Sequence, residues 1–148
     1  MKTYNPQYIN SAAWFNKSMT FLDYGRIIYL IQDNLGNATV SPDILHNLYL
    51  LASVSRKYFS HEVPYNIVTM NSEVILKFDD SQEQKIRIVY PEDIKTPQDK
   101  SLYSPIGSAC LGATEGSYIY FDDGSGGSRR ALIKKLVFQP EKEKLFYL

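Results

Sequence analysis

The sequence has 148 residues, of which 44% are hydrophobic and 14% aromatic, enough for one domain, or a domain with a small appendage, that buries a core. Sixteen basic and sixteen acidic residues give a formal net charge of zero, which argues against a protein that coats nucleic acid or an anionic membrane. A single cysteine, Cys110, excludes an internal disulfide, and only two histidines, His46 and His61, argue against a zinc site.

The first residues of the chain carry no recognisable targeting signal. Residues 1–14 lack the apolar core of a signal peptide, and no apolar run approaches the roughly 18 residues that a membrane span needs. We therefore expect a soluble, cytoplasmic protein with no membrane partner. The first 17 residues are rich in aromatic side chains but irregular, and a further short helix that packs on the rest is one interpretation of them.

Residues 18–59 follow a helical pattern. Apolar side chains recur there at spacings of three and four, which places the first group on one predicted helix face: Phe21, Tyr24, Ile28, Ile31 and Leu35. Thr20 or Ser18 is expected to cap this helix, and Asp23 lies near its positive end.

A polar turn divides the helical region into two predicted helices of roughly 16 residues each. Residues 34–37 (NLGN) end the first helix, because glycine and asparagine tolerate left-handed backbone geometry. Ser41, Pro42 and Asp43 open the second, as an N-cap serine, a proline at the first helical position and an acid. Its apolar face is predicted to contain Ile44, Leu48, Leu51 and Tyr58. Two helices joined by a short turn predict an antiparallel hairpin.

From about residue 64 the period of the pattern changes to two. Residues 67–78 and 84–90 alternate and are rich in β-branched side chains, so they predict two strands. Residues 79–83 (DDSQE) form the polar turn between them, and residues 91–100, which contain two prolines, predict a charged loop.

A short helix and a second pair of strands follow. Ser104 is a predicted N-cap with Pro105 at the first helical position, and Gly112 stands where a helix of about two turns ends. Small and apolar side chains on one face let this helix lie close to a sheet: Ile106, Ala109 and Cys110. Residues 117–121 and 129–138 predict strands joined by a glycine-rich hairpin loop. The fold class is therefore α+β, with a four-stranded, mostly antiparallel sheet.

The order of blocks along residues 63–148 resembles the C-terminal domain of the Gre transcription-elongation factors. The blocks are VTMNSEV, IRIVYPED, SPIGSACLGATEGS, a glycine-rich hairpin and LVFQP. The similarity is greatest to the small type within this family called regulator of nucleoside diphosphate kinase. The resemblance implies an FKBP-like C-terminal domain over residues 63–148, preceded by an N-terminal helical region over residues 1–60.

The resemblance also implies a partner, the core RNA polymerase. In Gre-type proteins the C-terminal domain docks on the coiled-coil rim of the polymerase secondary channel, and a Ser-Pro pair lies in the docking surface. Carried over, Ser104 and Pro105 would contact the polymerase, with Tyr103 and Ile106 as neighbours. The alternative is that Ser104 and Pro105 only start a helix, and one residue pair can serve both purposes.

The helical hairpin departs from the pattern of the Gre cleavage factors. Those proteins insert a long coiled coil whose acidic tip holds a magnesium ion for transcript hydrolysis. The turn here offers Asp33 and Asp43 but lacks the acidic run, and helices of this length, about 24 Å, are short for the task. We expect no cofactor, no metal and no transcript cleavage.

The sequence therefore predicts a non-enzymatic transcription regulator that binds RNA polymerase and places its hairpin at the mouth of the channel. A basic strand face leaves open a weak contact with nucleic acid inside the complex: Arg129, Arg130, Lys134 and Lys135. Two other classes stay as alternatives, a protein–protein adaptor that uses the tyrosine-rich N-terminal half and, from the FKBP-like fold, a peptidyl-prolyl isomerase. The oligomeric state and the direction of regulation stay open.

Overall fold

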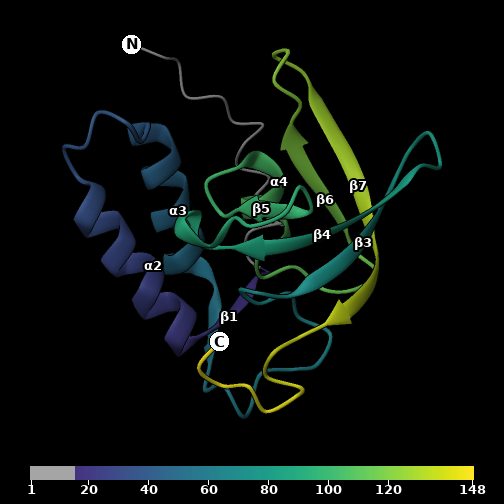
Figure 1. Ribbon diagram of the computed structural model, residues 1–148, viewed down its shortest axis with the longest axis horizontal. Helices are drawn as coiled ribbons and strands as arrows, with labels where there is room; N and C mark the ends of the chain where they lie inside the picture. The colour runs from purple at the N-terminus through teal and green to yellow at the C-terminus, as the bar shows by residue number, and fades with distance from the viewer. Residues whose placement is uncertain (1–15) are drawn as a thin grey trace.

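The computed structural model describes residues 16–148, so the short helix predicted near the N-terminus lies almost wholly outside the described residues. Two helices between a pair of short strands come first in the described chain, and a sheet with one short helix follows (Figure 1). This arrangement confirms the predicted α+β class. The elements are β1 (Ser18–Thr20), α2 (Phe21–Asn34), α3 (Pro42–Val54), β2 (Arg56–Tyr58), β3 (Glu73–Phe78), β4 (Glu83–Val89), a 3-10 turn η2 (Pro91–Asp93), β5 (Asp99–Ser101), α4 (Pro105–Cys110), β6 (Tyr118–Asp122) and β7 (Ser128–Phe138).

Helices α2 and α3 form the predicted antiparallel hairpin (Figure 1). The Thr20 hydroxyl oxygen accepts the Asp23 amide at 3.0 Å, which makes Thr20 rather than Ser18 the N-cap of α2. The Ser41 hydroxyl oxygen accepts the Asp43 amide at 3.2 Å and caps α3 in the same way. Gly36, with φ of +81°, lies in the turn between the helices, as the left-handed geometry requires.

The face that α2 buries differs from the predicted one. The buried side chains are Asp23, Ile27 and Ile31, a stripe at a spacing of four. Phe21 and Leu35, predicted on the buried face, are 48% and 68% exposed. The stripe is turned by one residue because Asp23 faces inward, where its carboxylate accepts hydrogen bonds from the sheet domain.

The helical pattern predicted up to residue 59 ends earlier than expected. Helix α3 stops at Val54, and residues 56–58 form strand β2, so Tyr58 belongs to a strand and not to the apolar face of α3. Strand β2 pairs in parallel with β1, with Ser18 opposite Arg56 and Thr20 opposite Tyr58. Three-residue strands carry too little period-two signal to compete with the helical pattern around them.

The larger sheet has five strands in the order β5-β4-β3-β7-β6. Strands β3, β4, β6 and β7 confirm the four predicted strands and pair with one another in antiparallel fashion. The fifth, β5, lies in the predicted charged loop and pairs in parallel with β4. Residues 67–72 were expected to belong to β3 but precede it, because Asn71 has φ of +65° and breaks the extended run.

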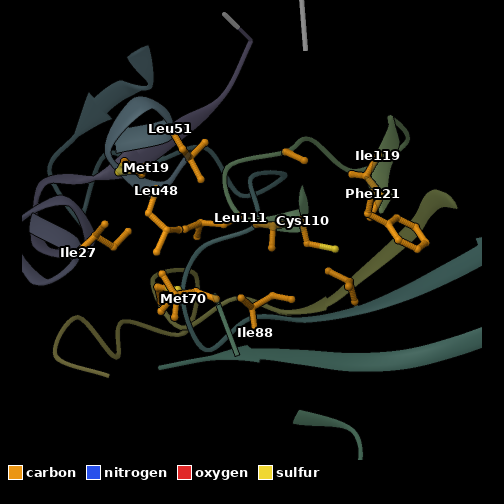
Figure 2. Packing of buried hydrophobic residues seen from close by; sticks show 14 of the residues in the cluster. Met19, Ile27, Leu48, Leu51, Met70, Ile88, Cys110, Leu111, Ile119 and Phe121 are labelled. Atoms are coloured by element: carbon orange, nitrogen blue, oxygen red, sulfur yellow. The ribbon is translucent and has the colours of Figure 1, made fainter. Parts of the chain in front are cut away.

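One cluster of buried side chains contains residues from both sides of the predicted domain boundary. Figure 2 shows Met19, Ile27, Leu48 and Leu51 of the helical region beside Leu111, with Cys110 between them and Phe121 of the sheet. The boundary itself, and the FKBP-like character of the sheet domain, stay predictions. The shared cluster means that the hairpin packs on the sheet domain through a continuous apolar contact.

None of the helices in the described part of the chain combines the length and the apolar character that crossing a membrane requires.

Candidate functional site

The Ser104 side chain makes two hydrogen bonds at the start of α4. Its hydroxyl oxygen accepts the Gly107 amide at 3.0 Å, and the hydroxyl donates to the Ser101 carbonyl oxygen at 2.7 Å. These contacts make Ser104 the N-cap of α4, as predicted, and tie the helix to the end of strand β5. The hydroxyl is therefore occupied inside the molecule.

Pro105 occupies the first position of α4. It is the exposed residue among Tyr103, Ser104, Pro105 and Ile106, so its ring is the most accessible part of the surface that these four residues form. Gly107, two residues later, is buried against Ser101, and a Cβ at residue 107 would overlap the Ser101 carbonyl oxygen. Because it has no side chain, Gly107 lets α4 approach β5 closely, and this approach sets the position of Pro105 relative to the sheet. Ser101 was not among the predicted site residues, because its role depends on the unpredicted strand β5.

Tyr103 and Ile106 flank the Ser-Pro pair and are both half-buried against the core. The Tyr103 hydroxyl is buried and has no hydrogen-bond partner within residues 16–148. Burial raises the pKa of Tyr103, and the nearby charges of Glu92 and Asp33 raise it further. A buried hydroxyl without a hydrogen-bond partner lowers the stability of the fold, and the Tyr103 hydroxyl carries this cost beside the start of α4.

The cysteine in this helix is a packing residue. Cys110 is completely buried, and burial raises the pKa of its thiol to about 12, which leaves it protonated and unreactive. Gly112 follows the helix with φ of +80°, and a Cβ there would lie 2.8 Å from the Ser18 carbonyl oxygen. The small residues of this segment thus let the helix pack tightly between the sheet and the helical region.

The two acids predicted at the hairpin tip lie at the ends of different helices. Asp33 is exposed in the last turn of α2, and its charge reaches Tyr103 beside the start of α4. Asp43 is exposed in the first turn of α3, where an acid favours the positive end of the helix. No group of three or more histidine, cysteine or acidic side chains suited to a metal occurs within residues 16–148.

Two features of the helical region were missed from the sequence. The first is an apolar groove of about 650 Å3 at the hairpin tip, lined by residues of both helices such as Ile28, Leu35, Val40 and Tyr49. The mixture of polar and apolar residues in 34–42 does not show whether the turn covers the apolar side chains of the two helices or leaves a groove between them.

The second is the buried carboxylate of Asp23. It accepts the Met70 amide at 3.1 Å and the Tyr90 hydroxyl at 3.3 Å, and so links α2 to the segments before β3 and after β4. Burial raises its pKa, against the lowering effect of the hydrogen bonds. An acid in the first turn of a helix is usually explained by the helix dipole, which hides this role in the sequence.

Two of the four cations of the basic strand face pair with acids. Arg130 pairs with Asp79 at 3.0 Å, and Lys134 pairs with Glu83. Arg129 lies over the Phe78 ring, 4.8 Å from its centre. The two ion pairs reduce the positive charge that this face offers to a polyanion, whereas Arg129 and the exposed Lys135 keep theirs.

Comparison with known proteins identifies the family. Residues 63–136 match the family model described as transcription elongation factor, GreA/GreB, C-term, which is half of the chain. The chain is 32% identical over 84 residues to the regulator of nucleoside diphosphate kinase of Escherichia coli (strain K12) and to that of Shigella flexneri. Each match covers 54% of this chain and 60% of the relative's length.

A solved structure extends the likeness beyond that segment. The prokaryotic transcription elongation factor GreA/GreB from Nitrosomonas europaea superposes with a TM-score of 0.67 at 29% identity. The match covers 82% of this chain and 98% of that chain, so it reaches into the helical region before residue 63. The chain therefore belongs to the GreA/GreB family of transcription elongation factors.

Proposed function

We propose that this protein regulates transcription by binding core RNA polymerase at the rim of its secondary channel, without cleaving the transcript. The docking surface is centred on Pro105, with Tyr103 and Ile106 beside it and Ser104 holding the helix start in place. The hairpin lies at the mouth of the channel. A partner of this kind implies action in the cytoplasm.

The observation that carries the proposal is the combination of family membership with an exposed Ser-Pro helix start. The family match includes residues 104–106, and Pro105 is the exposed member of the four predicted docking residues. Proline presents a rigid apolar ring, so a partner that covers it gains contact area at little cost in conformational entropy. The hydroxyl of Ser104 supports this surface from below.

The shape of the hairpin supports a role other than cleavage. Helix α2 has 14 residues and α3 has 13, which corresponds to lengths of about 20 Å. Asp33 and Asp43 stand on different helices, whereas a hard cation needs several oxygen ligands converging on one point. We infer a hairpin that occupies or blocks the channel mouth and carries no chemistry of its own.

The test is a binding titration of purified core RNA polymerase from the same organism with the wild-type protein and two double variants. The Ser104→Ala/Pro105→Ala pair removes the docking motif. The Ser41→Ala/Pro42→Ala pair is the matched control, because it removes the same cap and proline from the start of α3. We expect the first pair to weaken binding at least tenfold, about 1.4 kcal/mol, and the second to weaken it less than threefold.

Each other outcome rejects a definite part of the proposal. Equal weakening by both pairs would move the interface to the hairpin, and no weakening by either would remove the start of α4 from it. If the wild-type protein does not bind, polymerase regulation is wrong and the adaptor interpretation takes its place. Point variants are preferable to deletion of residues 1–60, because the deletion would expose the core that both regions share.

Cleavage is tested separately on backtracked transcription complexes. We expect no shortening of the transcript when the protein is added with magnesium, and reduced cleavage when it competes with a true cleavage factor. Stimulated cleavage that is lost on Asp33→Ala/Asp43→Ala replacement would overturn the non-catalytic part of the proposal. Retention on a single-stranded nucleic acid column, lost with Arg129→Ala, would show the weak contact that the basic strand face leaves open.

A further inference from the structure

The side chain of Lys17 lies at the C-terminal end of α4. Its amino group donates hydrogen bonds to the Ala109 carbonyl oxygen and, at 3.0 Å, to the Leu111 carbonyl oxygen. The last carbonyl groups of a helix have no partner within the helix, and a cation there also opposes the negative end of the helix dipole. A residue 94 positions before Leu111 thus caps the end of α4, the candidate docking helix.

The backbone of the same residue is tied to the hairpin. The Arg56 amide, which follows α3, donates to the Lys17 carbonyl oxygen at 3.0 Å. The next residue, Ser18, donates its amide to the Gly112 carbonyl oxygen at 3.0 Å. Lys17 therefore contacts the segment after α3 through its backbone and the end of α4 through its side chain, and it directly precedes β1, which leads into α2.

The packing around this contact leaves little freedom. A Cβ at residue 112 would lie 3.3 Å from the Cβ of Lys17, in addition to its overlap with Ser18. The amine is enclosed although the whole side chain is only half-buried, and burial lowers the pKa of Lys17 to about 8. An enclosed amine that keeps two carbonyl partners is costly to displace, so the contact has a defined geometry.

The other end of the docking helix also faces the hairpin. The Asp33 charge in the last turn of α2 acts on Tyr103, which precedes the N-cap Ser104. Figure 1 shows α4 between the hairpin and the sheet, and Figure 2 shows Leu111 beside Leu48 and Leu51 of α3. The helical region therefore meets α4 at its start, along its buried side and at its end.

We propose that Lys17 is a positioning residue that couples the hairpin to the docking helix, so that each responds to what binds the other. This inference rests on the proposed function, because it assigns the regulation of the same surface. A hairpin displaced by its surroundings in the channel would pull on β1, release the end of α4 and weaken docking. Docking at α4 would in turn hold the hairpin, because such a coupling is reciprocal.

The experiment compares Lys17→Met with Lys57→Met. Methionine keeps the length and the apolar stem of lysine and removes only the amine. Lys57 is the matched control, because its amine donates to the Ser53 carbonyl oxygen at 3.2 Å and caps the end of α3. Both full-length variants are compared with the wild type by circular dichroism, by amide hydrogen exchange with and without core RNA polymerase, and by their affinity for the polymerase.

We expect Lys17→Met to speed exchange at the Leu111 and Gly112 amides at least tenfold and to weaken polymerase binding at least fivefold. In the wild type, bound polymerase slows exchange at the Arg56 amide, and in Lys17→Met this protection is lost. A merely structural role for Lys17 would not remove a protection that depends on the bound partner. Lys57→Met leaves the α4 amides, the affinity and the Arg56 protection unchanged.

Rescue covers the case in which Lys17→Met folds poorly. Aminoethylation of Lys17→Cys rebuilds an amine on a side chain of lysine length, and Cys110 does not compete because it is buried and protonated. We expect the modified protein to regain slow exchange at Leu111 and at least half of the wild-type affinity. Recovery without the amine, by an alkylating reagent of equal length, would overturn the inference.

The failures of the two proposals are distinguishable. If the wild type does not bind polymerase, the proposed function is wrong, and the exchange rates at Leu111 and Gly112 still decide whether Lys17 holds α4. If the wild type binds, and Lys17→Met changes neither these rates nor the Arg56 protection, the coupling is wrong and the proposed function stands.

Discussion

The outer face of the sheet carries ion pairs beside the exposed Tyr118 and Tyr120, whereas the helical hairpin exposes large apolar side chains and an apolar groove. Glu73 is paired with both Lys85 and Arg87 on the sheet. On the hairpin, Tyr29 is 68% and Tyr49 52% exposed, and Tyr49 lines the apolar groove at its tip. Covering exposed ion pairs with a partner contributes little to the free energy of binding. Covering an exposed apolar surface contributes more.

The comparison assigns different tasks to the two regions. The sheet shares its buried side with the hairpin, and in the proposed function the hairpin and the start of α4 carry the contact surface. Four predictions test this division, beginning with the shared core on which it depends.

The largest effect is expected from truncating the core on either side of the predicted domain boundary. Leu48 of α3 and Leu76 of β3 are both almost completely buried in the same cluster. Replacement of either by alanine should lower the free energy of unfolding by about 2–5 kcal/mol. Because the cluster is continuous, urea unfolding followed by tyrosine fluorescence and by circular dichroism should give one coincident transition for each variant.

Two separate transitions, with Leu48→Ala shifting only one of them, would show that the hairpin and the sheet unfold independently. In that case the residues on either side of the boundary form two domains in the thermodynamic sense, and the shared core contributes little to cooperativity.

The second prediction concerns the polar contact between the two regions. Asp23→Ala leaves the Met70 amide and the Tyr90 hydroxyl without their acceptor, so we expect a loss of about 2–3 kcal/mol. Asp33→Ala, an exposed acid in the same helix, is the control and should change stability by less than about 0.5 kcal/mol. Equal effects in chemical denaturation would mean that Asp23 contributes only helix propensity.

The third prediction is a pH dependence that comes from the segment after β7. The Glu141 carboxylate accepts the Thr69 hydroxyl at 2.7 Å, and burial raises its pKa to about 7 from an ordinary value of 4.5. Between these two pH values the folded protein holds the proton and the unfolded chain does not. Stability from this group is therefore complete below pH 4.5 and is lost as the pH rises to 7.

Glu141→Gln should remove that decline, because glutamine keeps an acceptor for Thr69 and does not ionise. Glu143→Gln, at an exposed acid two residues later, is the control and should follow the wild-type curve. A set of thermal melts from pH 4 to pH 8 measures the difference between variants. If the melting temperatures of the wild type and Glu141→Gln depend on pH in the same way, the group responsible for the decline is not Glu141.

The smallest effect is expected on the outer face of the sheet. Arg87→Met breaks the contact with Glu73, where the side chain of Arg87 is 47% exposed, and should cost less than about 1 kcal/mol. The cost should fall further in 1 M salt, because exposed charges are screened there. Melting curves at low and high salt test this. If the loss of stability is the same at both salt concentrations, the packing of the arginine stem matters more than its charge.

Local chemistry accounts for the parts of the fold that were predictable. The serines and the threonine before each helix act through amides two or three residues away, so Thr20, Ser41 and Ser104 were recognisable as caps. The alternation in β3, β4, β6 and β7 likewise depends only on neighbouring residues. The start of α4 was therefore predictable as a structure, and its docking role rests on the family resemblance.

The parts that were missed depend on residues far apart in the chain. Strands β1, β2 and β5 have three residues each and exist because a distant segment pairs with them. Lys17 is 94 positions from Leu111, and nothing near either residue in the sequence indicates the contact. The burial of a different face of α2 has the same cause, since Asp23, which accepts the Met70 amide, lies 47 positions earlier.

The position of β3 in the sheet has a consequence for synthesis of the chain. This strand lies at the centre of the sheet, between β4, which follows it at once, and β7, the last strand made. On the ribosome, one edge of β3 stays unpaired until β7 has left the exit tunnel. An apolar strand with a free edge is a site of aggregation, so slow translation after β4 should lower the yield of native protein more than slow translation before β3.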